Sequence, residues 1–212
     1  MKIALIGATG FIGSALLKEA LSRGHQVAGL VAHPEKLLSQ PNLTALAADV
    51  LDQSRLADQL HGYDAVISAF SGHAQSNTFE YYMQGINSIV AASKQARVPR
   101  LLVVGGAGSL EVAPGVQALD TPEFPDAYKA TAEGARQALI LLRQEKELDW
   151  TMLSPSAVIA RGARTNSFRL GGDQMLVGAD GKSTISVEDY AVAMIDELET
   201  PAHSRRRFTV AY

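Results

Sequence analysis

The first fourteen residues constrain the fold more than any other stretch of this chain. Residues 3–6 (IALI) form an apolar run with the length of a buried parallel strand, and the run ends at Gly7. Glycines recur at Gly10 and Gly13, and apolar residues with helical spacing follow from Ile12 onward. A strand, a glycine-rich turn and a helix N-terminus in this order form a cradle for an anion, because unpaired N–H groups and the helix dipole attract negative charge.

Each glycine of this turn is expected to have a separate role. Gly7 permits the tight turn, Gly10 lets a pyrophosphate approach the backbone, and Gly13 allows the helix to pack closely on the strand. The spacing is GxxGxxG and not the GxGxxG of the dinucleotide fingerprint, so the glycines alone would also suit a turn in another α/β protein. Their position directly between a strand and a helix favours nucleotide binding.

Length and composition narrow the class of protein. The 212 residues suit one domain, and the apolar content of 47% is sufficient for one core. A net charge of −3 argues against nucleic acid and anionic membranes as partners. The absence of cysteine excludes disulfides and thiolate sites, and no metal site is expected. With no apolar run near the ~20 residues of a membrane span and no signal-peptide core, we expect a cytoplasmic monomer or homodimer that acts on a small molecule.

Segments typical of strands and helices alternate after the glycine turn. This alternation predicts a parallel sheet with right-handed crossovers, which is the α/β, Rossmann-like, doubly wound fold in a single domain over residues 1–212. The expected strands are residues 3–6, 26–31, 42–48, 65–70, 101–104 and 150–153, and the expected helices beyond the first are residues 34–38, 52–60, 78–96 and 126–146.

The character of the chain changes at Ser156. Residues 156–212 contain short segments punctuated by glycine, a helix that begins at a capping box over residues 186–189, and a final strand at 208–211. We expect this third of the chain to form a small cap over the carboxyl edge of the sheet, on the substrate side. The arginines at 205–207 are interpreted as a solvated entry to the last strand.

The residues after the second strand decide which dinucleotide binds. An acid there would hold the ribose hydroxyls of NAD, and a basic group would hold the 2′-phosphate of NADP. The strand ends at Ala32, and His33 and Lys36 follow, so NADP is slightly favoured over NAD, although both charges also suit a solvated loop. After the third strand, Asp49 can accept a hydrogen bond from the adenine amino group, whereas Asp52 fits a helix cap better.

With these motifs the chain resembles the atypical short-chain dehydrogenases. Within them it is similar to the small NAD(P)H-binding proteins labelled NADH–flavin reductases, which are akin to biliverdin reductase B. The resemblance extends over the whole chain, and its segments after residue 100 are more specific than the first motif, which the superfamily shares. The motifs are GATGFIG (7–13), ADVLD (48–52), VISAF (66–70), VVGGAGSL (103–110) and the segment 154–173.

The resemblance implies a role for individual residues. Ser109 falls near the position of the family's active-site serine. The other expected cofactor contacts are Gly7, Thr9, Gly10, Phe11 and Ile12 at the pyrophosphate, Asp49 and Val50 at adenine, Ser68, Ala69 and Phe70 beneath the ribose, and Ser154 and Pro155 beside the nicotinamide.

The proton-donating Tyr-x-x-x-Lys of typical short-chain dehydrogenases is absent. Tyr128 is followed by Lys129 and has Ala132 at the fourth position, so we expect it to be a surface or helix-start residue. Alcohol–ketone chemistry by that mechanism is therefore not expected. A flavin reductase needs less, because hydride can pass between stacked rings that the protein only positions.

We therefore expect an NAD(P)H-dependent oxidoreductase that reduces a planar acceptor such as flavin or quinone. Ser109 is the candidate for orienting the acceptor and His73 for donating a proton, although a lone loop histidine is more often a surface residue. Arg161 and Arg164 can hold an anionic acceptor or form salt bridges within the cap. The alternative is a non-catalytic sensor that reports the redox state of the dinucleotide to a protein partner. Nucleotide-sugar epimerisation fits a chain this short less well.

Overall fold

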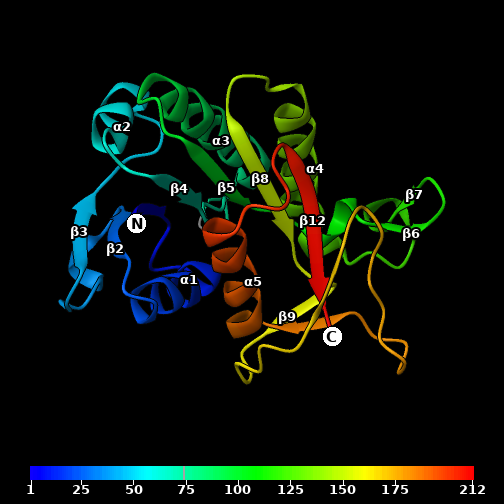
Figure 1. The fold of residues 1–212 in the computed structure, drawn as a ribbon. Helices are drawn as coiled ribbons and strands as arrows, with labels where there is room; N and C mark the ends of the chain where they lie inside the picture. Colours follow the sequence, from blue (N-terminus) through cyan, green and yellow to red (C-terminus); the bar gives the residue numbers. More distant parts are fainter. Residues whose placement is uncertain (74) are drawn as a thin grey trace.

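The computed structural model describes residues 1–73 and 75–212 and has an eight-stranded sheet at its centre (Figure 1). The strand order is β10-β12-β8-β5-β4-β1-β2-β3. The strands from β12 to β3 run parallel, and β10 pairs antiparallel with β12 at one edge. This arrangement confirms the predicted Rossmann-like, doubly wound α/β fold.

The bounds of the elements match the expected alternation of strands and helices. The parallel strands are β1 (Lys2–Ile6), β2 (Gln26–Val31), β3 (Leu43–Ala47), β4 (Ala65–Ser68), β5 (Arg100–Val104), β8 (Asp149–Ser154) and β12 (Arg206–Ala211). The α-helices are α1 (Phe11–Ser22), α2 (Gln53–Leu60), α3 (Thr78–Gln95), α4 (Asp126–Gln144) and α5 (Val187–Glu199). Three 3₁₀ turns are η1 (Pro34–Lys36), η2 (Ala107–Ser109) and η3 (Ala118–Asp120), and a small hairpin pairs β6 (Glu111–Ala113) with β7 (Val116–Gln117).

Helices cover both faces of the sheet, so the strands are apolar on both sides (Figure 1). On one face, α2, α3 and α4 pack over a core that includes Ile86 and Trp150. On the other, α1 and α5 pack over a core that includes Ile3, Leu5 and Phe208. In the described residues, no helix has the length and apolar content needed to cross a membrane.

The order of the strands reverses at β1. The chain moves from β1 outward to β2 and β3, and then returns to add β4, β5 and β8 on the other side. Ile6 at the end of β1 is in register with Ser68 at the end of β4. The connections that follow these two strands leave in opposite directions, which creates a crevice at the carboxyl edge where such sheets bind ligands.

The segment expected to form the cap, residues 156–212, divides into two parts. Helix α5 packs beside α1, and β12 is an interior strand between β8 and β10, so both belong to the core (Figure 1). The remaining stretch carries the edge strand β10 (Arg169–Gly171) and the parallel pairing of β9 (Val158–Ala160) with β11 (Thr184–Ser186). The part of the chain available to cover a substrate is therefore shorter than expected.

Candidate functional site

The glycine turn after β1 has the tight geometry that its spacing predicts. Gly7 has a φ of +82°, which favours glycine. A β-carbon at Gly13 would lie 2.0 Å from the Gly7 carbonyl oxygen, whereas one at Gly10 would lie 3.3 Å from it. Helix α1 then begins at Phe11, and the N-cap residue provides no side-chain hydrogen bond. The first N–H groups of α1 therefore face an open turn and can bind an anion.

A cleft of about 510 Å³ lies at the carboxyl edge next to this turn. Residues from the ends of β1, β2 and β3 and from the segment after β4 line it. Five of the residues predicted to contact the cofactor are among them, namely Gly7, Thr9, Asp49, Val50 and Phe70. A cleft of this size, with an anion cradle at one end, has the dimensions of a nucleotide site.

The other predicted cofactor residues lie outside the lining of this cleft. Gly10, Phe11 and Ile12 continue the turn into α1. Ser68 is buried at the end of β4, and Ala69 follows it directly against the glycine turn, because a β-carbon on Gly7 would lie 2.7 Å from the Ala69 carbonyl oxygen. The structure therefore brings the segments after β1 and β4 together.

The two basic residues expected at the 2′-phosphate lie in an exposed loop. His33 Nδ1 is 3.2 Å from Glu35 Oε1, and both side chains are largely exposed. Lys36 ends the short helix η1 and is also exposed. Neither His33 nor Lys36 is among the residues that line the cleft.

The two aspartates after β3 have different partners. Asp52 caps α2, because its Oδ1 accepts a hydrogen bond from Arg55 N at 3.1 Å. Asp49 lines the cleft and accepts one from Leu51 N at 2.9 Å. The expected assignment of the helix cap to Asp52 is confirmed, and Asp49 lies where it can contact a nucleotide.

Eight residues that line the cleft were not predicted to contact the cofactor, and two of them are polar residues on helices. Arg55 lies in the first turn of α2, and Tyr81 lies in the first turn of α3, where its ring centroid is 5.4 Å from that of Phe70. A signal was available, because helices that follow parallel strands point their N-termini at the carboxyl edge. First-turn residues of such helices are therefore candidates for ligand contact.

Ser109 lies beside a buried arginine. It ends η2 after β5 and is only 3% exposed. The Nη1 atom of Arg207 lies 3.4 Å from Ser109 Oγ and 3.3 Å from Ser154 Oγ, and its Nε donates to Asp173 Oδ1 at 2.7 Å. Ser109 and Ser154, predicted separately, thus share one partner at the carboxyl edge.

The expectation that residues 205–207 are solvated is wrong for Arg207, whose side chain is only 2% exposed. Arg207 is paired with Met152 of β8, and this register turns its side chain toward the interior. Burial lowers the pKa of the Arg207 guanidinium, and its hydrogen bond to Asp173 acts in the opposite direction. Arg206 remains exposed at the start of β12.

The residues at the start of α4 bear on proton donation. Tyr128 lies in the first turn of α4 and is 60% exposed, which confirms the expected helix-start position. Lys129 pairs with Asp126 at 2.6 Å, away from any Tyr-x-x-x-Lys arrangement. His73 is exposed in the loop after β4, and its Nδ1 lies 3.4 Å from Oγ1 of Thr131 in α4.

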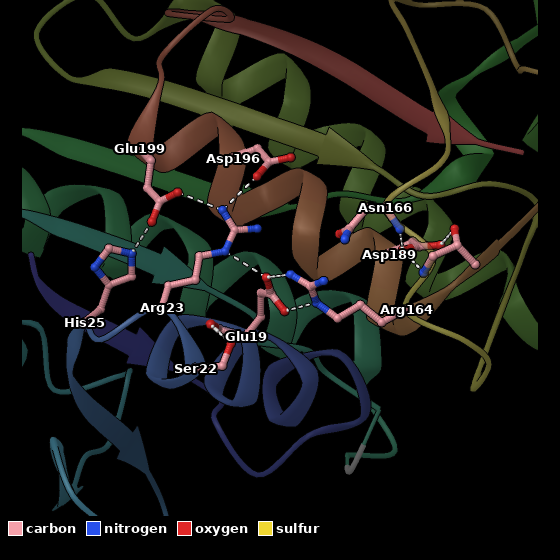
Figure 2. A network of polar contacts seen from close by, with 10 residues as sticks. Glu19, Ser22, Arg23, His25, Arg164, Asn166, Asp189, Asp196 and Glu199 are labelled. Carbon is pink, nitrogen blue, oxygen red and sulfur yellow. Dashed lines mark hydrogen bonds and ion pairs between the residues drawn. The ribbon is translucent and has the colours of Figure 1, made fainter.

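The structure separates the two arginines expected to bind an anionic acceptor. Arg164 donates from Nε and Nη2 to the carboxylate of Glu19, each at 2.7 Å, and so ties the segment after β9 to α1 (Figure 2). The guanidinium carbon of Arg161 lies 5.6 Å from the ring centroid of Phe11, at the N-terminus of α1. Arg161 is therefore near the glycine turn. Arg164 forms a salt bridge, as the alternative interpretation expected, but its partner lies on α1 and not within the cap.

Glu19 is the centre of the polar network between α1 and α5 (Figure 2). It is only 5% exposed, and it also accepts a hydrogen bond from Arg23 Nε at 2.7 Å. Arg23 continues the network to Asp196 and Glu199 of α5, at 2.7 Å each. The hydrogen bond from Arg164, together with those from Arg23, lowers the pKa of Glu19 against the opposing effect of burial.

A second buried carboxylate, Asp189 of α5, holds the same segment. It accepts hydrogen bonds from the backbone N–H groups of Thr165 and Asn166 at 2.8 and 2.9 Å, and Figure 2 shows Asn166 beside it. The Tyr212 hydroxyl donates a further hydrogen bond to Asp189 at 2.8 Å. Ser186 caps α5 as the capping box predicts, accepting from Asp189 N at 3.0 Å. The segment that carries Arg161 and Arg164 is thus fixed to both α1 and α5.

Other features of the surface fit a ligand site less well. A cleft of about 490 Å³ at the amino ends of the strands is lined by Lys2, Gln26 and Leu43, but open α/β sheets bind ligands at the opposite edge. Among residues 1–73 and 75–212, no group of three histidine or acidic side chains is placed to hold a metal ion.

Comparisons with known proteins agree with the nucleotide geometry. A family model described as NAD(P)H-binding matches residues 7–201. The Bacillus subtilis protein YwnB, which is described as uncharacterized, is 41% identical over 99% of this chain and 98% of its own length.

Two solved structures are similar over the whole chain. A Bacteroides thetaiotaomicron protein described as a "putative epimerase" is 45% identical, with a TM-score of 0.94 over 100% of this chain and 96% of that one. A Streptococcus pneumoniae protein described as a "putative NADH-flavin reductase" is 34% identical, with a TM-score of 0.85 over 100% and 99%. The glycine cradle, the open N-terminus of α1 and the adjoining cleft fit the same cofactor. The chain therefore belongs to the NAD(P)H-binding family and has a Rossmann-like fold.

Proposed function

We propose that this protein is an NAD(P)H-dependent reductase that reduces a small planar acceptor, such as a flavin or a quinone, in the cytoplasm. The observation that carries the proposal is a dinucleotide cleft whose lining tyrosine, Tyr81, has Gly85 and not a lysine four positions later, so that it forms no Tyr-x-x-x-Lys pair. Tyr128 is solvent-exposed, and position 132 on the same face of α4 is alanine instead of lysine. The similarity to the S. pneumoniae protein supports this choice over alcohol–ketone chemistry.

The residues of the cleft bind and orient the cofactor in this proposal. The turn from Gly7 to Ile12 holds the pyrophosphate with backbone N–H groups, and Asp49 accepts a hydrogen bond from the adenine amino group. Phe70 would contact the ribose, and Ser154 and Pro155 would flank the nicotinamide. Bound NAD(P)H supplies the hydride, and the acceptor takes its proton from water or from a weak donor.

Ser109 and His73 are the proposed acceptor-side residues. Every hydrogen on the Arg207 guanidinium is a donor, so the contact between Arg207 and Ser109 Oγ uses a lone pair of the serine. The hydroxyl hydrogen of Ser109 then remains available for a carbonyl or ring nitrogen of the acceptor. His73 is exposed near the start of α4, where a donor would have access to water.

Steady-state turnover tests the proposal. The protein is mixed, in the absence of oxygen, with NADPH or NADH and with riboflavin, FMN or a benzoquinone. The absorbance of the reduced nicotinamide at about 340 nm is then followed. We expect this absorbance to fall with at least one acceptor, and Ser109→Ala to reduce the rate. Tight binding of both redox forms without turnover of any acceptor would contradict the proposal and favour the redox sensor. Interconversion of nucleotide sugars without net consumption of NAD(P)H would favour an epimerase.

A further inference from the structure

The carboxyl ends of β2 and β3 form the part of the cleft where an adenosine ribose would lie. Val31 is in register with Ala47, and Ala48 N donates to the Val31 carbonyl oxygen at 3.0 Å. The small residues Ala32, Ala47 and Ala48 all line the cleft here. In NAD-binding proteins of this fold, an acid at the end of β2 holds the ribose hydroxyls. This chain has Ala32 at that position, so the site has no carboxylate there and has space for a larger group.

Helix α2 holds Arg55 over this space. The Nε2 of Gln59 donates to the Ala47 carbonyl oxygen at 2.9 Å, so one face of α2 is fixed against the end of β3. Arg55 precedes Gln59 by four residues and therefore lies on the same face, one turn nearer the helix N-terminus. It consequently extends past the end of β3 and lines the cleft together with Ala32 and Ala48.

The guanidinium of Arg55 has no protein ion pair or side-chain hydrogen bond within residues 1–73 and 75–212. The acid in the lining of the cleft is Asp49, which accepts a hydrogen bond from Leu51 N. His33 and Lys36, the two basic residues expected at the 2′-phosphate, lie outside the lining of the cleft, and His33 contacts Glu35. Arg55 is thus a cation facing the cleft beside a ribose position that lacks an acid.

From this geometry we infer that Arg55 binds the 2′-phosphate of the cofactor and makes the protein select NADPH over NADH. An arginine suits this role because its planar guanidinium donates two parallel hydrogen bonds to phosphate oxygens and stays charged. NADH has a hydroxyl at this position and leaves the guanidinium hydrated. The inference rests on cofactor binding and is independent of the acceptor and of the reductase chemistry.

Equilibrium binding of NADPH and NADH tests the role of Arg55 without turnover. Dissociation constants are measured by nucleotide fluorescence for the wild type, Arg55→Gln and Arg55→Lys, with Lys36→Gln and His33→Gln as matched controls. We expect Arg55→Gln to weaken NADPH binding by about tenfold or more and NADH binding by less than about twofold. Arg55→Lys should recover part of the NADPH affinity, and the two controls should leave the preference unchanged.

Two smaller probes separate the 2′-phosphate from other contacts of Arg55. In calorimetry, 2′,5′-ADP should lose affinity in Arg55→Gln, whereas 5′-ADP should not. Equal weakening of both probes would show that Arg55 contacts the adenine or the pyrophosphate and would overturn the inference. A wild type that prefers NADH, or a preference that changes only in Lys36→Gln or His33→Gln, would also overturn it. Thermal melting checks that each variant is folded.

Discussion

At the scale of single residues, the glycines of the turn after β1 differ in what the lack of a side chain allows: close packing of the helix at Gly13, and space for a ligand at Gly10. The position of Gly7, Gly10 and Gly13 between a strand and a helix led to the prediction of a separate role for each. The structure adds the distances, because a β-carbon at position 13 would lie 2.0 Å from a backbone oxygen and one at position 10 would lie 3.3 Å from the same atom. Gly13 therefore serves the packing of α1 on β1, whereas Gly10 leaves space in the turn for the proposed pyrophosphate.

This difference predicts opposite effects for two matched substitutions. Gly13→Ala forces the backbone apart, and we expect it to cost at least about 3 kcal/mol of unfolding free energy, or roughly 6–12 °C in Tm. Gly10→Ala should cost less than about 1 kcal/mol but raise the dissociation constant for NADPH, because the added methyl group faces the pyrophosphate. Thermal melts and nucleotide fluorescence measure the two effects. Equal loss of stability in both variants would contradict the assignment.

The buried arginine gives a second prediction at this scale. Asp173→Ala leaves the guanidinium of Arg207 buried with only neutral partners, so we expect a loss of about 2–3 kcal/mol. Arg207→Met leaves Asp173, which is 52% exposed and still paired with Arg143 at 2.8 Å, and should cost less. Urea unfolding compares the two variants. A larger loss for Arg207→Met would show that packing, and not the buried charge, dominates the cluster.

Single-residue prediction had clear limits in this chain. The sequence shows three consecutive arginines at 205–207, but it does not show that β12 is an interior strand. Only the register with β8 determines that Arg207 points inward while Arg206 stays exposed. The first-turn position of Arg55 was a signal in the sequence, but its contact with the cleft depends on how α2 lies against β3.

At the scale of elements, the polar network centred on Glu19 joins three segments that are far apart in the sequence. Glu19 lies on α1, its partner Arg164 lies after β9, and Arg23 extends the contacts to α5. The apolar faces of α1 and α5 are visible in the sequence as helical periodicity. The pairing of Glu19 with Arg164, 145 residues apart, is not. Sequence reasoning therefore predicted the helices but not the contacts that fix the segment near the site.

This network should make stability depend on pH in a defined direction. The folded-state pKa of Glu19 is below its ordinary value of 4.5, so its contribution is present above about that pH and is lost as the pH falls through the folded-state pKa. We expect Glu19→Gln to lower the unfolding free energy by about 2 kcal/mol at pH 7, with less difference from the wild type in acid.

Urea unfolding at a series of pH values measures this effect, with Glu123→Gln as the control because Glu123 is exposed and makes no hydrogen bond in the described part of the chain. A Glu19→Gln variant that differs from the wild type by the same amount at every pH would contradict the ionic role of Glu19. An effect of equal size in Glu123→Gln would show that the loss of any carboxylate explains it.

At the scale of the whole molecule, the alternation of strands and helices was sufficient to predict the fold and the edge that holds the site. Local patterns are informative here because the parallel strands are short and most of them are followed by a helix that covers one face of the sheet or the other. The C-terminal third was harder to interpret. Its last helix and strand return to the core, so the division between core and cap depends on long-range pairing that no local pattern reports.

The family and the fold fix the cofactor class, and the reaction remains the central claim to be tested. Single-turnover reduction of an acceptor by NADPH bearing deuterium at both transferable positions measures hydride transfer most directly, because it separates the chemical step from product release. We predict that FMN or a quinone oxidises the bound cofactor within one turnover, and that the deuterated cofactor reacts more slowly than the unlabelled one. A bound cofactor that stays reduced in the presence of every acceptor would contradict the account.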